Sequence, residues 1–387
     1  MIATIKSSFT ANYNNKPLLI KAPGRVNLIG EHTDYNLGYV LPASIDKAIY
    51  FAIQPNASHT ICVETFITAP EKIVFDLQGN PRPFQSSWGN YFKAILKILV
   101  AMRYELKGFD CVFGGDLPIG SGLSSSAALC CGFIFALSEA LALKISREEI
   151  ALLAQKTEHS IGLNCGLMDQ YALLYGKKNY ALFLDCKDLR YQYIPIHLKG
   201  YSWVLINSNI KHNLALDAAY NKRRASCELV VNKIRSFKNN VLSLRDVTLG
   251  DLKKIRDKVS SVDYQRAHYV LSENERVLQM KTALAKGYPE EIGKILLNGH
   301  WAMANEFEIT TKELDYLVKI GEELPSVMGA RMMGGGFGGC TINLVKTTAV
   351  NQTIETILHC YKTQTGILAE AYPLEIADGI SLVNVTQ

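Results

Sequence analysis

Four polar side chains that could bind a polar ligand lie close together near the N-terminus: Arg25, Glu31, His32 and Asp34, in the segment 24–38. An ionised carboxylate accepts two or more hydroxyl hydrogen bonds, and an imidazole donates or accepts. A guanidinium offers a fixed fork of donors that suits a carboxylate or a phosphate. A segment so rich in charge and glycine is a poor core strand and a poor helix, so we expect a loop whose groups converge on a ligand. This chemistry, without an apolar wall, is that of a sugar pocket; the alternative is a solvated loop with an incidental cluster of charges.

A turn rich in glycine and serine spans residues 118–128. It follows a short strand expected at 109–114 and opens an apolar helix expected over 127–143. Glycines let the backbone turn sharply, and the N–H groups at a helix start attract anions. We therefore expect a phosphate site, whose three serines could also bind phosphate oxygens or a metal. Alternatively, Ser124 or Ser125 simply caps the helix. The turn lacks the lysine of a Walker A loop and the third glycine of a dinucleotide fingerprint.

A single carboxylate, Asp169, stands among small and apolar residues in the segment 164–171. A buried unpaired charge is costly, so Asp169 needs a partner, and Arg25 is the natural candidate. Such a pair would keep the aspartate ionised. Glu158 lies at the end of the preceding helix and could join a serine of the turn around a divalent cation. Magnesium suits such a site, because it takes hard oxygen ligands, few of them from protein. Taken alone, Asp169 is better explained as a structural residue; beside the other motifs it is a catalytic candidate.

Five glycines fall within the six residues 334–339, after Arg331 and before a strand expected at 341–346. A flexible linker would be polar. Here two methionines, a phenylalanine and a cysteine stand beside and between the glycines, which indicates a packed loop with unusual backbone angles. We expect its backbone to lie close to a substrate or to the turn at 118–128; the alternative is a loose loop.

The bulk composition excludes several classes of protein. The chain has 387 residues, of which 48% are hydrophobic and 20% charged, as in ordinary globular proteins. The formal net charge of +5 suits an anionic substrate but falls short of a nucleic-acid-binding stripe. The most apolar segment, 127–143, is too short and too interrupted to span a bilayer. Nine cysteines, odd in number and without a CxxC pair, predict reduced thiols in a cytosolic protein.

Strand-like and helical segments alternate, which predicts a mixed α/β fold. Length predicts two domains, with three as the alternative; we place the boundary at 195/196, giving an N-terminal domain over 1–195 and a C-terminal domain over 196–387. A capping box at Ser146 and Glu149 opens one of the helices. The expected strands are 18–22, 48–54, 60–68, 109–114, 180–185, 202–208 and 341–346, and the expected helices are 90–103, 127–143, 146–159, 214–236, 262–286, 289–306, 311–322 and 350–366.

In this order the three glycine-rich motifs resemble those of the GHMP small-molecule kinases, which include galactokinase, homoserine kinase, mevalonate kinase and phosphomevalonate kinase. Residues 24–36 resemble the galactokinase signature at nearly every position, and 165–170 resemble that family's catalytic segment, with Leu167 where isoleucine is commoner. The resemblance covers roughly residues 20–345. It implies the two-domain GHMP α/β fold, with the active site in the cleft between the domains.

The resemblance also implies residue roles. Asp169 is expected to be the catalytic base or charge anchor facing the sugar C1 hydroxyl, and Arg25 to orient it and to stabilise charge on the transferring phosphoryl group. Trp88 and Tyr91 resemble an adenine-side segment but could equally be core aromatics. The implied substrate site comprises Glu31, His32, Thr33, Asp34, Gly166, Asp169 and Tyr220; the nucleotide site comprises Gly120, Ser121, Gly122, Leu123, Ser124, Ser125, Ser126, Trp88 and Tyr91; and the metal site comprises Ser125 or Ser126 with Glu158.

The activity implied by the resemblance is the phosphorylation of α-D-galactose at O1, with ATP as co-substrate and Mg²⁺ as cofactor. The implied enzyme is a cytoplasmic monomer without nucleic-acid or membrane partners. One alternative is an N-acetylgalactosamine kinase, although residues 32–36 favour the unsubstituted sugar. The other is a galactose-sensing regulator with a kinase fold and no turnover, which the intact motif at 122–127 disfavours.

Overall fold

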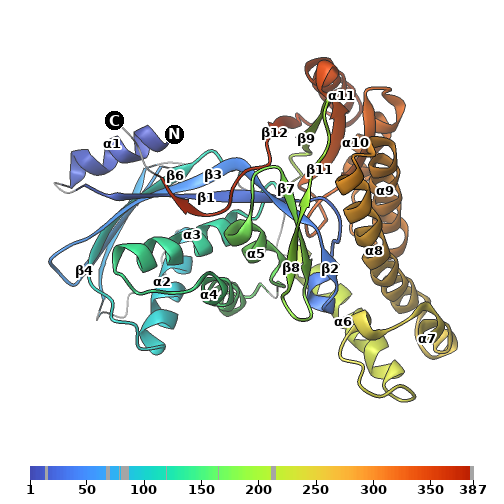
Figure 1. Cartoon of the computed structure of the whole chain (residues 1–387), viewed down its shortest axis with the longest axis horizontal. Helices are drawn as coiled ribbons and strands as arrows, with labels where there is room; N and C mark the ends of the chain where they lie inside the picture. The colour runs from blue at the N-terminus through green and yellow to red at the C-terminus, as the bar shows by residue number, and fades with distance from the viewer. Residues whose placement is uncertain are drawn as a thin grey trace.

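The computed structural model describes residues 1–13, 16–66, 70–77, 79, 87–118, 120–163, 165–210 and 215–383. Figure 1 shows a large sheet on the left, a small sheet in the middle and a third sheet on the right, with helices packed on them. Ile119 and Asn164, from two of the predicted motifs, lie outside the described residues, as do the end of the strand expected at 60–68 and the first residue of the helix expected at 214–236.

The large sheet is antiparallel except where β4 runs parallel to β6. Residues of β3 alternate between its two faces, as the pleat of a strand requires: Phe51 and Ile53 enter the main core, and Ala52 enters a smaller core on the other side. The strand order is β13 (Ser381–Leu382), β1 (Leu18–Asn27), β3 (Pro42–Pro55), β6 (Phe109–Gly115), β4 (Thr60–Thr65) and β5 (Glu71–Asp76).

Helices cover both faces of this sheet (Figure 1). The sequence analysis did not predict the first of them, α1, whose buried anchors Ile5 and Phe9 are one turn apart and pack on β3 and β6. A helix this short depends on such packing rather than on its own propensity. The helices are α1 (Ile2–Asn12) on one face, and α2 (Ser87–Ala101), α3 (Ser125–Ala140), α4 (Arg147–Ser160) and α5 (Met168–Tyr175) on the other.

The rest of the chain forms two smaller sheets and a helical region on the right of Figure 1. The middle sheet has the order β2 (Tyr39–Val40), β7 (Tyr180–Asp185), β8 (Tyr191–Pro195), and the third has the order β10 (Val327–Met332), β11 (Cys340–Lys346), β9 (Tyr201–Asn207), β12 (Glu370–Leu374). The helices are α6 (Ala215–Ile234), α7 (Leu249–Lys253), α8 (Ser261–Lys286), α9 (Pro289–Ala302) with a π-helical turn η4 (Met303–Phe307), α10 (Lys312–Glu323) and α11 (Val350–Thr365), with short 3-10 turns η1 (Asp34–Asn36), η2 (Leu244–Asp246), η3 (Arg256–Lys258) and η5 (Thr347–Ala349).

The main core is continuous from the large sheet to β9, β11, α8 and α9. The last strand, β13, returns to the large sheet, where Leu382 pairs with Ile20. The division at 195/196 stays a prediction; it falls between β8 and β9, and β13 crosses it.

Two local expectations need correction. The segment 24–38 is not all loop, because β1 continues to Asn27; the partner strand β3 supplies the hydrogen bonds that the composition alone did not suggest. The loop proper, here called the polar loop, spans residues 28–38. The capping box is half formed: Ser146 accepts from the N–H of Glu149 at 3.2 Å, but the Glu149 carboxylate accepts from the hydroxyl of Tyr104 instead.

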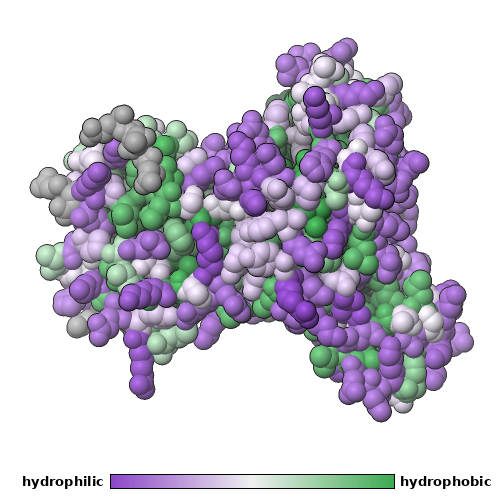
Figure 2. Space-filling model, in the orientation of Figure 1, coloured by the Kyte–Doolittle hydropathy of each residue, from purple (hydrophilic) through white to green (hydrophobic). Residues whose placement is uncertain are grey.

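The molecular surface in Figure 2 is mostly hydrophilic. Hydrophobic residues gather at its lower right, over α6 and α7. Leu229 on α6 and Leu249 on α7 are exposed, as is Leu242 between these helices. Within the described part of the chain, every helix is too short or too polar to cross a membrane. All nine cysteines are described, and all are free thiols.

Candidate active site

A cavity of about 240 Å³ lies where the predicted motifs meet. The end of β1 and the polar loop form one wall, the N-terminal ends of α3 and α5 another, and α6 with residues 334–337 a third. This volume suits one small polar molecule better than a drug-sized ligand. The lining residues are Arg25, Glu31, His32, Asp34, Ser126, Glu158, Gly162, Leu163, Cys165, Gly166, Met168, Asp169, Tyr220, Asn221, Gly334, Gly335, Gly336 and Phe337.

Three donors hold the Asp169 carboxylate at this cavity. Arg25 donates from Nε to Oδ1 at 2.7 Å and from Nη2 to Oδ2 at 3.1 Å, a bidentate pair of the strong kind. The Ser124 hydroxyl also donates to Oδ2. The Arg25 side chain is only 5% exposed, whereas that of Asp169 is 26% exposed. The expected ion pair is therefore present, and Asp169 keeps access to a ligand.

The end of β1 is shaped to aim Arg25 at this point. The register of β1 on β3 shifts just before Arg25, and such irregularities re-aim side chains. Gly24 has no room for a side chain, because a Cβ there would lie 2.4 Å from Cδ1 of Leu117. The Arg25 N–H donates to the Leu123 carbonyl at 3.2 Å, and its Nη1 donates to the Gly122 carbonyl. Arg25 thus joins β1 to the glycine–serine turn as well as to Asp169.

The glycine–serine turn leaves the start of α3 open. Gly120 and Gly122 have φ of +72° and +76°, a conformation that favours glycine. Ser124 occupies the N-cap position with φ of 60° but makes no cap hydrogen bond, since its hydroxyl goes to Asp169. The capping alternative is therefore wrong. Among the residues that the structure describes, no side chain caps the first N–H groups of α3, as an anion site requires.

Three residues predicted at the nucleotide site have side chains that pack or hydrogen-bond within the protein. Ser121 is buried and donates to the Pro118 carbonyl at 2.8 Å, which stabilises the turn itself. Leu123 belongs to the main core. Trp88 packs edge-on against Phe113, with ring centroids 5.1 Å apart, and donates from Nε1 to Glu71 at 2.7 Å. The structure therefore favours the core alternative for Trp88.

Glu158, Ser126 and Gln170 form a polar cluster on the α3 side of the cavity. Ser126 donates to Oε1 of Glu158 at 2.8 Å, and Gln170 donates from Nε2 to Oε2 at 2.5 Å. Burial raises the pKa of the Glu158 carboxyl to about 7, against the hydrogen bond from Ser126. Tyr91 lies beside this cluster, within hydrogen-bonding reach of Ser126, and burial raises the pKa of its hydroxyl. Ser125 is not among the cavity-lining residues.

This cluster fits a magnesium ion that is also held by phosphates. A carboxylate whose ionised form is penalised by burial gains from a nearby cation, and a carboxylate with a serine hydroxyl supplies the few hard ligands that magnesium takes from protein. Among the described residues, no group of three or more His, Cys, Asp or Glu could hold a metal by itself, so phosphate oxygens and water would have to complete the coordination. Of the two candidate serines, Ser126 has this geometry.

His32 is a neutral, fixed hydrogen-bonding group at the polar loop. Burial lowers the pKa of its imidazole to about 4. Its Nε2 lies 3.2 Å from the Gly335 carbonyl and its Nδ1 lies 2.7 Å from the Tyr35 hydroxyl. Because a carbonyl only accepts, Nε2 carries the proton and Nδ1 accepts from Tyr35. The Tyr220 ring lies against the imidazole, with centroids 4.9 Å apart.

Asp34 and Gly166 both line the cavity and pack directly against one another. A Cβ on Gly166 would lie 2.1 Å from Oδ2 of Asp34, so only glycine lets the two segments approach this closely. Burial raises the pKa of the Asp34 carboxyl to about 6, against the hydrogen bond that its Oδ1 accepts from the Tyr35 N–H at 2.8 Å. Asp34 thus combines a hydrogen-bond acceptor with an environment that disfavours its charge.

Two residues predicted to bind substrate have partners inside the protein. Thr33 is fully buried and does not line the cavity; its hydroxyl reaches the carbonyls of Gly30 and Tyr39 and holds the polar loop in shape. Glu31 does line the cavity, but its Oε1 accepts from the Gly334 N–H at 3.1 Å and its Oε2 pairs with Arg331.

The late glycine cluster approaches both the cavity and the glycine–serine turn. Gly334, Gly335 and Gly336 line the cavity. A Cβ on Gly339, where φ is +82°, would lie 3.4 Å from the Ser121 carbonyl oxygen. The close approach expected from the sequence is confirmed, and the loose-loop alternative is wrong.

Sequence reasoning assigned no role to several residues of the site. Gln170 and Arg331 stand inside motifs that were recognised, next to Asp169 and to the glycine cluster, and that position was the one available signal. Phe337, inside the glycine cluster, and Asn221, beside Tyr220, also line the cavity.

Comparison with protein families places the chain in a known class. The model of the GHMP kinases N terminal domain matches residues 90–177, and that of the GHMP kinases C terminal region matches 280–362. The solved mevalonate kinase of Methanococcus jannaschii shares the fold, with a TM-score of 0.65 at 19% identity over 95% of this chain and 100% of that chain. The fold is that of a GHMP kinase, and the expected fold class is confirmed.

Closer matches narrow the class. The galactokinase galactose-binding signature matches residues 7–55. The galactokinase of Chloroflexus aggregans is 37% identical over 100% of this chain and 99% of its own length. The galactokinase of Clostridium perfringens is 36% identical over 97% of this chain and 98% of its own length. The crystal structure of Lactococcus lactis galactokinase complexed with galactose has a TM-score of 0.92 at 31% identity, covering 98% of this chain and 99% of that one. The chain belongs to the galactokinase family.

Proposed function

We propose that the chain transfers the γ-phosphoryl group of ATP to O1 of α-D-galactose, giving galactose 1-phosphate and ADP. The observation that carries this proposal is the placement of Asp169, held by Arg25 and Ser124 in one cavity with the polar loop and with the open start of α3. The same carboxylate can therefore reach a sugar hydroxyl and the end of a nucleotide.

The sugar would bind between the polar loop, Gly166 and Tyr220. Asp34 would be the main acceptor for sugar hydroxyls, and Gly166 makes room for its carboxylate. The neutral His32 is held by Tyr35 and by the Gly335 carbonyl, so it shapes the pocket more than it donates to the sugar. Glu31 lies at the edge of this pocket, and its remaining lone pairs can accept one hydroxyl.

The nucleotide phosphates would lie at the start of α3. The N–H groups there and the turn at Gly120 and Gly122 favour anions. Glu158 and Ser126 would hold Mg²⁺, with the alternative serine, Ser125, one residue away. When bound, this ion neutralises phosphate charge.

Asp169 and Arg25 would act on the transfer itself. Three donors on the Asp169 carboxylate stabilise its charged form. This favours a role as charge anchor that holds the O1 hydroxyl in line and takes its proton late, over early deprotonation. Arg25, which bridges Asp169 and the Gly122 carbonyl, places positive charge where the phosphoryl group passes.

We also propose that the enzyme works as a monomer in the cytoplasm. Nine free cysteines, most of them buried, suit a reducing compartment.

A coupled assay of ADP release with ATP, Mg²⁺ and a panel of sugars tests the proposed activity. We expect turnover with galactose and much slower turnover with glucose, because a polar pocket discriminates strongly between patterns of hydroxyl groups. Faster turnover with N-acetylgalactosamine than with galactose would identify N-acetylgalactosamine as the substrate instead. Galactose binding without ADP release would overturn the kinase activity in favour of a sensor.

A further inference from the structure

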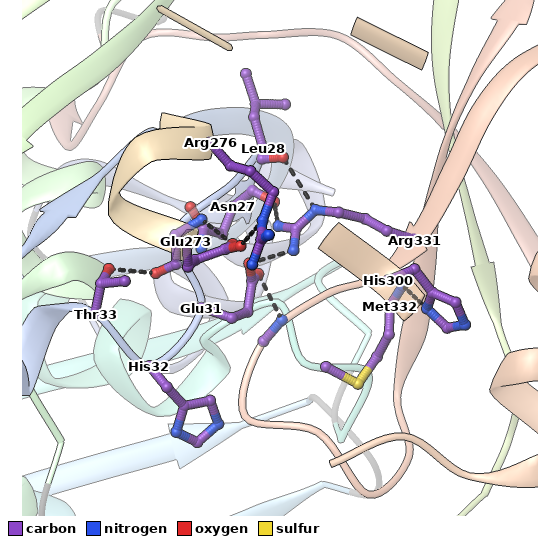
Figure 3. A network of polar contacts seen from close by, with 12 residues as sticks. Asn27, Leu28, Glu31, His32, Thr33, Glu273, Arg276, His300, Arg331 and Met332 are labelled. Carbon is purple, nitrogen blue, oxygen red and sulfur yellow. Dashed lines mark hydrogen bonds and ion pairs between the residues drawn. The ribbon is translucent and has the colours of Figure 1, made fainter. Parts of the chain in front are cut away.

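The C-terminal half of the chain holds the backbone of the polar loop through one buried arginine (Figure 3). Arg331, on β10, donates from Nε to the Leu28 carbonyl at 3.0 Å and from Nη2 to the Asn27 carbonyl at 2.7 Å. Its third nitrogen, Nη1, pairs with the Glu31 carboxylate. One planar side chain therefore fixes three points along five residues, which a guanidinium fork can do and an ammonium cannot.

A second pair of buried charges supports the same stretch (Figure 3). Glu273, on α8, accepts from the Gly30 N–H at 2.9 Å and from Nε of Arg276 at 2.6 Å. Glu273 and Arg331 are both fully buried. Two guanidinium groups thus balance two carboxylates within the network.

The network also ties two walls of the cavity together. The Glu31 carboxylate that pairs with Arg331 accepts, on its other oxygen, from the Gly334 N–H at 3.1 Å. Gly334 and its two successors line the cavity opposite the polar loop. Arg331 itself does not line the cavity, so any effect on a ligand must pass through Glu31 and the loop.

Buried ion pairs are weak contributors to stability, because desolvation offsets most of their attraction. The hydrogen bonds and ion pairs of this network therefore matter more for fixing the position of the polar loop than for stability. The backbone at 27–31 leads directly into His32 and Asp34. A displacement of about 1 Å at such a site can lower the reaction rate on the order of a hundredfold.

We propose that Arg331 is a positioning residue for the sugar side of the site. It holds Glu31 and the backbone of 27–31 so that the polar loop presents Asp34 and His32 to the sugar. The inference rests on the proposed function, since it takes galactose to be the ligand of this loop.

The test is Arg331→Lys, which keeps the buried charge but loses the fork. Calorimetric titration measures the affinities for galactose and for ADP separately. We expect the Kd for galactose to rise roughly ten- to a hundredfold and the Kd for ADP to rise by a clearly smaller factor, because Arg331 bonds to the backbone at 27–28 and to Glu31 rather than to the phosphate side of the site. A galactose Kd within about twofold of wild type, or an equal loss of affinity for both ligands, overturns the inference.

Arg147→Lys is a matched control. Arg147 also donates to two main-chain carbonyls, those of Leu174 and Ile380, but it does not line the cavity or touch the polar loop. This control should lower thermal stability and leave galactose affinity unchanged. If it weakens galactose binding as much as Arg331→Lys, the effect is general loosening and the inference is wrong.

The wild-type protein provides a second test, which decides the matter if Arg331→Lys does not fold. The Gly30 N–H donates to Glu273, and the Met332 N–H donates to His300. Neither Gly30 nor Met332 lines the cavity. Galactose alone should slow their amide exchange through the network, and unchanged exchange would contradict the coupling. The two proposals can fail separately. If the wild-type protein binds galactose but releases no ADP, the proposed activity is refuted and the inference is not. If the Arg331→Lys variant has normal turnover and normal galactose affinity, the inference is refuted and the activity is not.

Discussion

Replacing Asp169 by asparagine tests the centre of the proposed site. The Asp169 carboxylate accepts two hydrogen bonds from Arg25 and one from Ser124. An amide of the same shape has one acceptor oxygen, and its NH₂ group would face donors. Asp169→Asn therefore removes the negative charge and leaves at least one donor of a guanidinium that is only 5% exposed without a partner.

The expected loss can be worked from these contacts. General acid–base catalysis contributes about 10²–10⁴-fold, and an electrostatic contact about 10²–10³-fold. The carboxylate supplies at least one of these, so turnover should fall on the order of 10³-fold or more, which corresponds to about 4 kcal/mol of transition-state stabilisation. Galactose affinity should change little, since Asp34 and the polar loop remain.

The assay is ADP release at saturating galactose, ATP and Mg²⁺, with galactose affinity measured by calorimetry. Asp185→Asn is a matched control, because Asp185 also pairs with an arginine, Arg245, at 3.3 Å and its side chain is similarly exposed, at 21%. The control should keep normal turnover. Near-normal turnover by a folded Asp169→Asn variant, or an equal loss in the control, would refute the reasoning.

Three further predictions concern the groups around Asp169. Arg25→Ala should lower kcat on the order of 10²–10³-fold with a smaller change in ADP affinity, measured by steady-state kinetics and calorimetry; the opposite pattern would give Arg25 a binding role. Glu158→Gln should raise the Mg²⁺ concentration for half-maximal activity roughly ten- to a hundredfold and leave galactose binding without metal unchanged. An unaltered Mg²⁺ requirement would show that Glu158 does not belong to the metal site. Burial raises the pKa of the Asp34 carboxyl from 3.8 to about 6, so the folded protein retains a proton that the unfolded chain releases, and stability falls as pH rises through that window. Asp34→Asn should therefore stabilise the free protein near pH 7.5 by about 1–3 kcal/mol and have little effect near pH 4; equal shifts in Tm at both pH values would contradict this.

Features of the site that depend on a local sequence pattern could be predicted from the sequence. A helix opened by glycines must present free N–H groups, and a lone carboxylate among apolar residues must find a cation, which is why Arg25 could be paired with Asp169 across 144 positions. The close approach of the late glycine cluster followed from glycines placed among apolar residues.

Contacts that depend on long-range register were not accessible. Arg25 lies in a strand because β3 pairs with it, and the composition of the segment gave the opposite impression. Thr33 and Ser121 belong to the right motifs, but their hydroxyls turn toward the backbone, and a motif does not state which way a side chain points. Arg331 reaches carbonyls about 300 positions away, a contact that no pattern in one sequence reveals.

The pairing of β13 with β1 has a consequence for synthesis. Leu382 and Ser381 complete the edge of the large sheet beside Ile20 and Lys21, and Ile380 is buried in the main core. A nascent chain on the ribosome must therefore expose this part of the β1 edge until residues 381–382 have emerged. Unpaired strand edges favour aggregation, so a product truncated before residue 380 should be prone to aggregate although it contains every residue of the proposed site.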